Sequence, residues 1–410
     1  MTAFAKIDMR EATRLTREGR LSEAMAVLRG EAAAIPRPSA TGDGNRPGPS
    51  KPAAPFLDMV PPSPGTGGAW TSPGSMATRR AERTKTVSAS HLAVPEALRD
   101  LFRRTEKFGP AGRSSGPSTA APDGAKFEER VYSNDAGSRA YKLYIPSGYD
   151  GQALPLVVML HGCTQSPDDF AAGTRMNDLA EKQTFLVAYP AQPSSANASK
   201  CWNWFNTGDQ QRDRGEPSLI AGITRRIMSD FPVDAGRIYI AGLSAGGAAA
   251  AIMGSTYPDL YSAVGVHSGL ACGAARDMPS AFTAMRQGGP AEGKTKRTRR
   301  AIPTIVFHGD RDATVNPING DQVIAQAKAS AELRITVSCG KAPGGIRFTR
   351  TVQADERGNP VLEQWVLHGA GHAWSGGSTA GSFTEPRGPD ATGEMVRFFL
   401  QRSAATTSAA

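Results

Sequence analysis

Residues 237–246 read Arg237-Ile238-Tyr239-Ile240-Ala241-Gly242-Leu243-Ser244-Ala245-Gly246, an apolar strand-like run that ends in a G-x-S-x-G pentapeptide. An alanine-rich stretch typical of a helix, 247–254, follows directly. A serine between a strand and a helix lies on a sharp turn, where the flanking glycines avoid clashes and Oγ projects above the sheet. A glycine-rich turn with an incidental serine is the alternative, but the strand and helix context favours a nucleophile. We therefore predict that Ser244 is a nucleophile.

Two carboxylates that could orient a catalytic histidine follow a later predicted strand. The run 301–307 is apolar and β-branched, and it leads into a polar loop that contains Asp310 and Asp312. In an α/β-hydrolase the acid follows the serine along the chain, and the histidine follows the acid. We prefer Asp312 because it lies deeper in the loop, and Asp310 is the fallback. Either side chain could instead cap the loop by accepting backbone N–H groups.

The candidate base comes from the end of the chain. Of the six histidines, only His368 and His372 follow Asp312. The alternating run 361–367 predicts a strand that ends just before His368, so we expect His368 to pack or to hydrogen-bond locally. Glycines on both sides of Ala370 allow a tight loop that would bring His372 to the nucleophile. We therefore predict His372 as the general base.

The predicted oxyanion donors are two backbone N–H groups, one after the nucleophile and one from the loop after an earlier strand. The apolar run 155–160 ends in His161-Gly162-Cys163, which supplies that loop. We expect the N–H groups of Ala245 and Cys163 to face the developing negative charge. His161 precedes the nucleophile, and we expect it to fix the loop rather than to act as a base.

Taken together, these motifs resemble the poly(3-hydroxybutyrate) depolymerase-type esterases, which are related to feruloyl and acetylxylan esterases. The resemblance covers roughly residues 127–400. It implies a serine esterase of the α/β-hydrolase fold, with Ser244, Asp312 and His372 as its triad and without a cofactor. The substrate that it implies is poly(3-hydroxybutyrate) or its oligomers. The motifs that carry it are His161-Gly162-Cys163-Thr164-Gln165, Cys201-Trp202-Asn203-Trp204-Phe205, Gly242-Leu243-Ser244-Ala245-Gly246, the loop with Asp312, and Gly371-His372-Ala373-Trp374.

The same resemblance implies two further features near the site. One is an aromatic binding cleft, which we place on Trp202, Trp204 and Trp374; ordinary core packing is the alternative for each of them. The other is a disulfide between Cys163 and Cys201, which would tie the oxyanion loop to the tryptophan segment. A feruloyl or acetylxylan esterase would use the same catalytic residues. A protein that binds polymer granules and uses the hydrolase fold only as a scaffold is an alternative of another class.

We divide the chain into four parts. Residues 1–31 predict a short helical hairpin, which could serve for docking or form only a surface appendage. Residues 32–125 are expected to be a mostly disordered linker, since 14 of the 30 prolines lie between residues 36 and 122 and large apolar side chains are few. The α/β-hydrolase domain is predicted at 126–403, and 404–410 is a disordered tail.

Within 126–403, alternating strands and helices predict a mostly parallel sheet that helices cover on both faces. Residues 127–144 favour two strands joined by a turn at 134–137. The shorter runs 184–189 and 263–266 predict buried strands, and 217–231 predicts a helix.

Charge and cysteine content restrict the partners. Residues 1–125 hold 18 Lys and Arg against 12 Asp and Glu, so contact with a granule surface is conceivable for this segment. The basic run 294–300 has no interleaved aromatic residue, which favours a solvated insertion over a nucleic-acid site. The four cysteines have no metal-binding spacing, and no apolar run is long enough to span a membrane. The family resemblance implies an extracellular protein. The charged residues 1–20 do not resemble an export signal, which favours the cytoplasm.

Overall fold

The computed structural model describes residues 121–290, 302–328 and 332–401. The predicted helical hairpin, the tail, the basic run 294–300 and nearly all of the predicted linker lie outside the described residues. Every helix in the described part of the chain is too short or too polar to cross a lipid bilayer.

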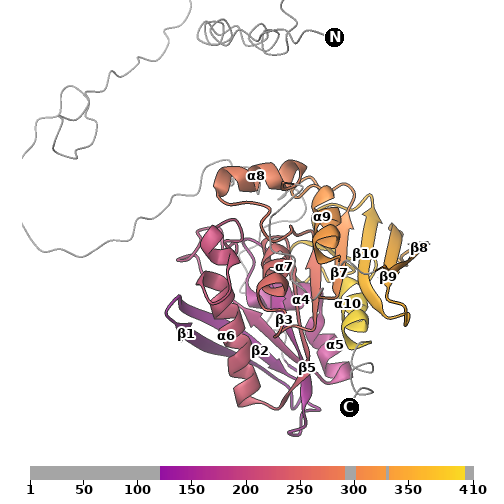
Figure 1. The fold of residues 1–410 in the computed structure, drawn as a ribbon. Helices are drawn as coiled ribbons and strands as arrows, with labels where there is room; N and C mark the ends of the chain where they lie inside the picture. Colours follow the sequence, from indigo (N-terminus) through magenta and orange to yellow (C-terminus); the bar gives the residue numbers. More distant parts are fainter. Residues whose placement is uncertain (1–120, 291–301, 329–331, 402–410) are drawn as a thin grey trace, which may run out of the picture. The chain divides into compact units, whose positions relative to one another are not determined.

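A ten-stranded sheet forms the centre of the described part, in the order β1-β2-β4-β3-β5-β6-β7-β10-β9-β8 (Figure 1). Strands β4, β3, β5, β6, β7 and β10 are parallel to one another, and antiparallel strands extend the sheet at both ends. The strands are β1 Lys126–Asn134, β2 Gly137–Ile145, β3 Leu154–Leu160, β4 Leu186–Pro190, β5 Val233–Leu243, β6 Ala263–His267, β7 Thr304–Gly309, β8 Arg334–Lys341, β9 Arg347–Ala354 and β10 Pro360–His368.

Helices cover both faces of this sheet. Successive residues of a strand point their apolar side chains to opposite faces, so both faces need a covering layer. In β3, Leu156 and Val158 face one core, whereas Val157 and Met159 face the other. Helices α6 to α9 pack on the first side, and α4, α5 and α10 pack on the second. The helices are α4 Pro167–Thr174, α5 Met176–Gln183, α6 Gly215–Asp230, α7 Ala245–Thr256, α8 Met278–Gln287, α9 Ile318–Ala327 and α10 Ala391–Leu400, with a 3-10 turn at Thr207–Gln210.

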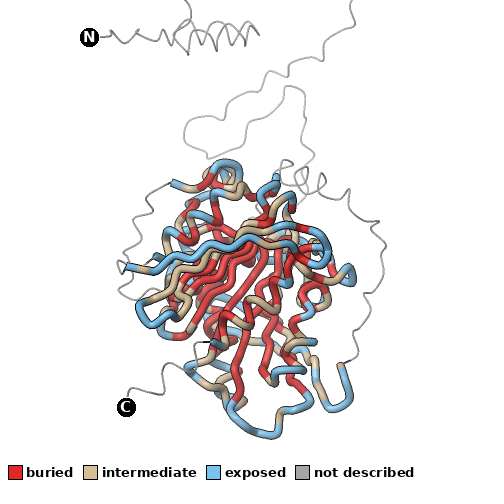
Figure 2. The backbone as a smooth tube through the Cα atoms, turned by 90° about the vertical axis from the view of Figure 1, so that its right-hand side faces the viewer, coloured by how far each residue is buried: buried red, intermediate tan, exposed pale blue. Residues whose placement is uncertain are grey.

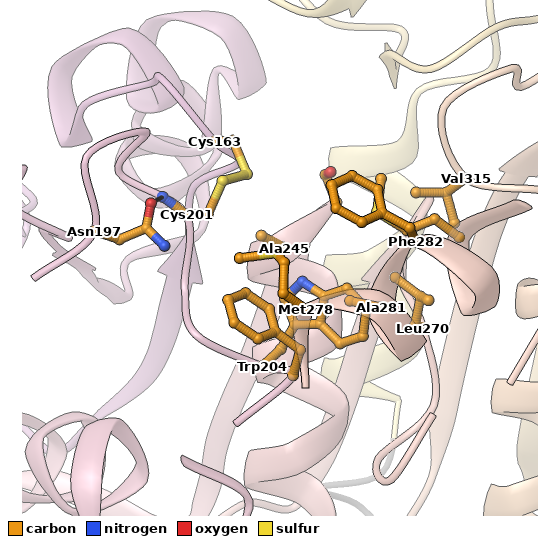
Figure 3. A pocket seen from close by; sticks show the side chains of 13 residues that line it. Cys163, Asn197, Cys201, Trp204, Ala245, Leu270, Met278, Ala281, Phe282 and Val315 are labelled. Carbon is orange, nitrogen blue, oxygen red and sulfur yellow. Dashed lines mark hydrogen bonds between the residues drawn. A yellow bond between two sulfur atoms is a disulfide. The ribbon is translucent and has the colours of Figure 1, made fainter. Parts of the chain in front are cut away.

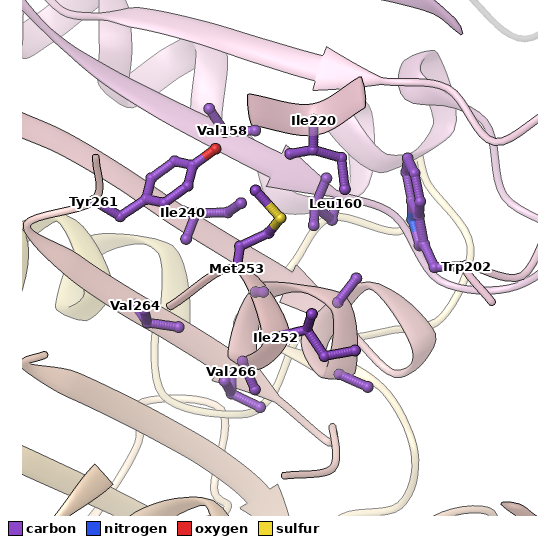
Figure 4. Packing of buried hydrophobic residues seen from close by; sticks show 14 of the residues in the cluster. Val158, Leu160, Trp202, Ile220, Ile240, Ile252, Met253, Tyr261, Val264 and Val266 are labelled. Atoms are coloured by element: carbon purple, nitrogen blue, oxygen red, sulfur yellow. The ribbon is translucent and has the colours of Figure 1, made fainter. Parts of the chain in front are cut away.

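Strands β3, β4, β6 and β7 are buried along their whole length, and β5 is buried over its second half (Figure 2). Burial on both faces explains why these strands are continuous apolar runs in the sequence. Helix α7 is almost wholly alanine and glycine where it meets the sheet, so it packs close to β5 and β6. Figure 4 shows Ile252 and Met253 of α7 against the strand residues Ile240 and Val264.

The architecture confirms the predicted α/β-hydrolase fold and most of the predicted elements. The hairpin turn forms as expected, with Asn134 accepting the N–H of Ala136 at 2.8 Å and Gly137 at φ 124°. The features that were not predicted include the helices α4, α5 and α9, the antiparallel strands β8 and β9, and a small two-stranded sheet of β11 Trp374–Ser375 and β12 Thr384–Glu385.

Candidate active site

Ser244 lies at the turn between β5 and α7, in a backbone conformation that serine rarely adopts. Its φ of 58° and ψ of −120° lie outside the regions that are relaxed for an L-residue. The turn is held because the N–H of Ser244 donates to the carbonyl of His267 at 2.9 Å, which continues the pairing of β5 with β6. A Cβ on Gly246 would clash with the carbonyl oxygens of Leu160 and His161, so the turn requires glycine there.

His372 and Asp312, the predicted base and acid, form a buried pair. The Nδ1 of His372 lies 2.7 Å from Oδ2 of Asp312, and the two side chains are 7% and 0% exposed. An ionised carboxylate can only accept, so Nδ1 carries the ring proton. Nε2 of the neutral ring then keeps its lone pair and is free to act as a base. The parallel strands β5, β7 and β10 place Ser244, Asp312 and His372 at one edge of the sheet.

Asp312 also fixes its own loop, so the two roles considered for it coexist. Its Oδ1 accepts the N–H groups of Thr314 at 2.9 Å and Val315 at 2.8 Å. His308 brings its Nε2 to 3.4 Å from Oδ2 while bonding the carbonyl of Val315 at 2.9 Å. Burial raises the pKa of Asp312, but attraction to the protonated form of His372 and the bonds from His308 and His372 outweigh burial. The pKa of Asp312 therefore lies well below its ordinary value.

Asp310, the fallback acid, pairs with the other histidine. Its Oδ2 lies 3.0 Å from Nδ1 of His368, and its Oδ1 accepts the N–H of Gly369 at 2.7 Å. Both side chains are 37% exposed, in contrast to the buried pair. The next residue, Arg311, donates its N–H to the carbonyl of Ala370 at 3.0 Å. Asp310 thus joins the loop after β7 to the loop that carries His372. His368 forms a hydrogen bond close to the end of its own strand, as expected.

The loop after β3 packs against the nucleophile and leaves donors available. A Cβ on Gly162 would lie 3.6 Å from Cβ of Ser244, so the two backbones are in close contact. The N–H of Gly162 donates to Gln165 at 2.9 Å. Within the described residues, the N–H of Cys163 has no acceptor. Ala245 is the first residue of α7, where a backbone N–H has no partner inside the helix. That both amides stabilise an oxyanion stays a prediction.

His161 is a fully hydrogen-bonded neutral residue inside this loop. Its Nδ1 donates to the carbonyl of Gly162 at 2.7 Å, and its Nε2 accepts the N–H of Gln192 at 3.1 Å. Burial lowers the pKa of His161 to about 4. Both ring nitrogens are therefore used to hold the loop.

A largely apolar pocket opens beside Ser244 and encloses about 560 Å³, counting the space open to solvent (Figure 3). Figure 3 shows the Cys163–Cys201 disulfide and Asn197 on one side, with Phe282 and Val315 facing them. The lining residues are Cys163, Asn197, Cys201, Trp204, Phe205, Ser244, Ala245, Leu270, Met278, Ala281, Phe282, Met285 and Val315.

The three predicted cleft tryptophans have different surroundings. Trp204 lines the pocket. Trp202 is completely buried and donates its Nε1–H to the carbonyl of His161 at 3.1 Å, so it supports the oxyanion loop from behind. Trp374 is buried, lies 5.2 Å from the ring of His267 and donates its Nε1–H to Thr392 at 3.0 Å. The structure thus gives Trp202 and Trp374 packing positions and does not place them in the pocket wall. Substrate binding stays a prediction, carried by Trp204.

Cys163 and Cys201 form a disulfide, which confirms the pairing that the family resemblance implied. Both cysteines line the pocket, so the bond joins the oxyanion loop to the loop that carries Trp204. The other two cysteines are free thiols, with Cys272 buried and Cys339 exposed.

We expect Cys201→Ser to weaken both stability and catalysis. The two cysteines are 38 residues apart in the chain, and closing a loop of that length stabilises a fold by about 4 kcal/mol in the chain-entropy account. The freed loop would also hold the Cys163 amide less firmly, which we expect to lower kcat about tenfold or more. Denaturant unfolding and esterase assays with and without reductant measure both effects. Cys339→Ser, at an exposed free thiol, is the matched control. Equal stability of oxidised and reduced wild type would contradict the prediction.

A buried carboxylate that sequence reasoning missed, Glu216 of α6, stands behind the same loops. It accepts the backbone N–H and the Nδ2–H of Asn203, both at 2.7 Å, and it bonds the side chain of Gln192. Gln192 in turn donates its backbone N–H to His161. Glu216 thus links the oxyanion loop to the segment around Trp204. A glutamate at the start of a helix gives no sequence signal for this role.

Replacing Glu216 with glutamine is expected to destabilise the fold in a pH-dependent way. Burial, and then the charge of Asp209, raise the pKa of Glu216 from 4.5 to about 7, more than the bonds from Asn203 and Gln192 lower it. The folded state therefore binds this proton more tightly. The stabilisation that comes from binding this proton is complete below pH 4.5. It is lost as the pH rises towards 7, and the free energy of unfolding falls by about 3 kcal/mol in total.

The measurement is the free energy of unfolding of wild type and Glu216→Gln between pH 4.5 and 7. The variant leaves at least one donor without an acceptor, at a cost of about 1–3 kcal/mol. The difference in free energy of unfolding between wild type and Glu216→Gln should shrink as the pH rises. A difference that is constant with pH would show that Glu216 does not titrate in this window.

Comparison with known proteins now identifies the family. A family model described as esterase PHB depolymerase matches residues 139–344, which is half of the chain. The chain belongs to this esterase family. The match spans β2 to the end of β8 and so includes Ser244 and Asp312, while His372 lies beyond it.

Known members and relatives of the esterase PHB depolymerase family carry more than one activity in their names. Poly(3-hydroxyalkanoate) depolymerase C of Paucimonas lemoignei is 33% identical over 239 residues, which cover 56% of this chain and 57% of that protein. The chain therefore spans little more than half of that relative's length. Feruloyl esterase B of Thermothelomyces thermophilus is 27% identical, over 56% of this chain and 82% of that protein. Among solved structures, an acetyl xylan esterase from Aspergillus awamori is 20% identical with a TM-score of 0.48, covering 60% of this chain and 94% of that one.

Proposed function

We propose that the protein is a serine carboxylesterase that hydrolyses 3-hydroxyalkanoate esters, such as poly(3-hydroxybutyrate) or its oligomers. The observation that carries the proposal is the buried His372–Asp312 pair at the same sheet edge as Ser244, whose backbone has the strained conformation of a nucleophile turn. The apolar pocket that contains Ser244 supports it as a place for the acyl group.

The proposed reaction has two steps. Nε2 of His372 takes the proton of Ser244 as Oγ attacks the ester carbonyl, and the N–H groups of Ala245 and Cys163 hold the oxyanion. His372 then protonates the departing alcohol, which leaves an acyl group on Ser244. Water enters, gives a proton to His372 and attacks the acyl carbonyl. His372 then returns this proton to Oγ of Ser244 as the acyl–oxygen bond breaks, which releases the acid and restores the free serine. Asp312 keeps His372 in the required tautomer and stabilises the imidazolium that forms in each step.

The named activity of the 33% identical relative supports a 3-hydroxyalkanoate substrate. A feruloyl ester is the second candidate, because Trp204, Phe205 and Phe282 would provide an aromatic surface for a ferulic ring. An acetylated polysaccharide has less support, since its acyl group is small and the pocket offers few polar side chains for a sugar.

The test is a comparison of kcat/KM on three substrates: 3-hydroxybutyrate oligomers, methyl ferulate and acetylated xylan. We expect the highest value on the oligomers, with free 3-hydroxybutyrate as the product. A higher value on methyl ferulate would replace the proposal with the feruloyl alternative. No product from any of the three would contradict the proposed esterase function.

A further inference from the structure

One wall of the pocket consists of a single face of α8. Met278, Ala281, Phe282 and Met285 all line the pocket, and their spacing of three, four and seven residues places them in one row along the helix. Met278, Phe282 and Met285 are only partly buried. Met278 and Met285 pack against the core on one side and line the pocket on the other. Figure 3 shows Phe282 across the pocket from the disulfide.

The backbone of α8 is fixed to the catalytic loops. At its start, Asp277 accepts the N–H of Ser280 at 2.9 Å and forms a capping box. At its end, the carbonyl of Met285 accepts the N–H of Asn316 at 2.7 Å, next to Val315, whose own N–H bonds Asp312. The helix therefore keeps its place beside the site, while its methionine side chains can adopt several rotamers and adjust to different apolar groups.

The chemistry of the lining restricts what can occupy the space. Apart from the indole N–H of Trp204, the hydrogen-bonding side chains of the lining are those of Asn197 and Ser244, and none of the three belongs to α8. A polar group pushed against α8 would lose its hydrogen bonds to water without replacement, which is unfavourable. An unbranched hydrocarbon chain would lose nothing and would gain from burial. The row from Met278 to Met285 spans seven residues, about 10 Å along the helix axis, which is longer than a four-carbon acyl chain.

We propose that this α8 face is the wall of the acyl site, and that the site accepts acyl chains longer than the four carbons of a hydroxybutyrate unit. The acyl chain length that the enzyme prefers is then determined by Met278, Ala281, Phe282 and Met285. The inference rests on the proposed esterase function and specifies the substrate class of that site.

The test uses p-nitrophenyl acetate, butyrate, hexanoate, octanoate and decanoate, with kcat/KM measured for each. Wild type should prefer hexanoate or octanoate over acetate. Ala281→Leu narrows the pocket, and we expect it to lower kcat/KM on octanoate about 100-fold relative to kcat/KM on acetate, because apolar pockets discriminate chains on this scale. Met285→Ala enlarges the pocket and should move the preference towards decanoate.

Thr283→Leu is the matched control, because Thr283 lies on the same helix but is exposed and does not line the pocket. It introduces the same leucine side chain at an exposed position of the helix and should leave the profile unaltered. The enlarging variant Met285→Ala keeps the test valid if Ala281→Leu does not fold. A wild type that prefers acetate, or variants that change all esters equally, would overturn the acyl-wall inference alone. A wild type that cleaves none of the esters would count against the proposed function itself.

Discussion

Replacing Ser244 with alanine is expected to lower kcat by about 10⁶-fold, because a nucleophile and its base act as a unit and loss of either removes the covalent route. The remaining rate would come from binding and from the oxyanion donors. Alanine preserves the backbone turn and the close packing around it, so the loss would report chemistry rather than folding. The measurement is the initial rate on the best substrate of the panel, with the unfolding midpoint determined in parallel.

Ser268→Ala is the matched control for this variant. Ser268 is also a buried serine, and it also has a positive φ, 49°, directly after the neighbouring strand β6. Its substitution should change kcat less than about tenfold. Loss of activity to the same extent in both variants would mean that the strand edge has been disturbed, and Ser244 would no longer be identified as the nucleophile.

The strain in the turn at Ser244 allows a second test at this residue, in which stability is measured together with activity. Glycine adopts the φ and ψ of Ser244 without the strain that a side chain brings, and such strain costs about 1–3 kcal/mol. Ser244→Gly should therefore abolish activity and yet raise the free energy of unfolding. A variant that is inactive and less stable would contradict the idea that the turn stores strain for positioning Oγ.

Local patterns in the sequence were sufficient to predict the strands at the centre of the sheet and to propose the order of the site residues along the chain. Apolar runs that end in polar loops predicted β3, β5, β7 and β10, and parallel strands bring the ends of such runs to one edge. Nothing local could decide between Asp310 and Asp312, since both lie in the same loop. Their difference is burial: of these two pairs, only Asp312–His372 is removed from solvent.

Other parts of the site depend on contacts between distant segments. Met278, Ala281, Phe282 and Met285 have a helical spacing that is equally typical of a core face, and only the packed structure shows that they border open space. The tryptophans show that residues close together in the sequence can have different surroundings. Trp202 and Trp204 are two residues apart, yet one supports the oxyanion loop and the other lines the pocket. Asn203, which lies between the two rings, bonds Glu216, and the preceding Cys201 forms the disulfide, so this stretch is held by contacts with distant segments.

The substitution Asp312→Asn is expected to lower kcat by about 10⁴-fold, the scale of losing the required histidine tautomer. The amide oxygen of the new side chain could still accept the N–H groups of Thr314 and Val315, so the loop would survive. The NH₂ group of the new side chain would then face Nδ1 of His372, which would have to accept. The ring proton would move to Nε2, and His372 could no longer take the proton of Ser244.

Asp310→Asn is the matched control, since the same chemical change is made two residues away in the same loop. The amide oxygen of that variant can still accept the N–H of Gly369, and the partner His368 is partly solvated, so we expect less than about a tenfold fall in kcat. Stability gives an independent check. The lowered pKa of Asp312 means that its ionised form stabilises the fold above the ordinary pKa, and this contribution is lost as the pH falls. Asp312→Asn should thus be less stable than wild type at pH 7, with a gap that narrows in acid. Equal losses of activity in the two variants would assign the acid role to neither aspartate alone.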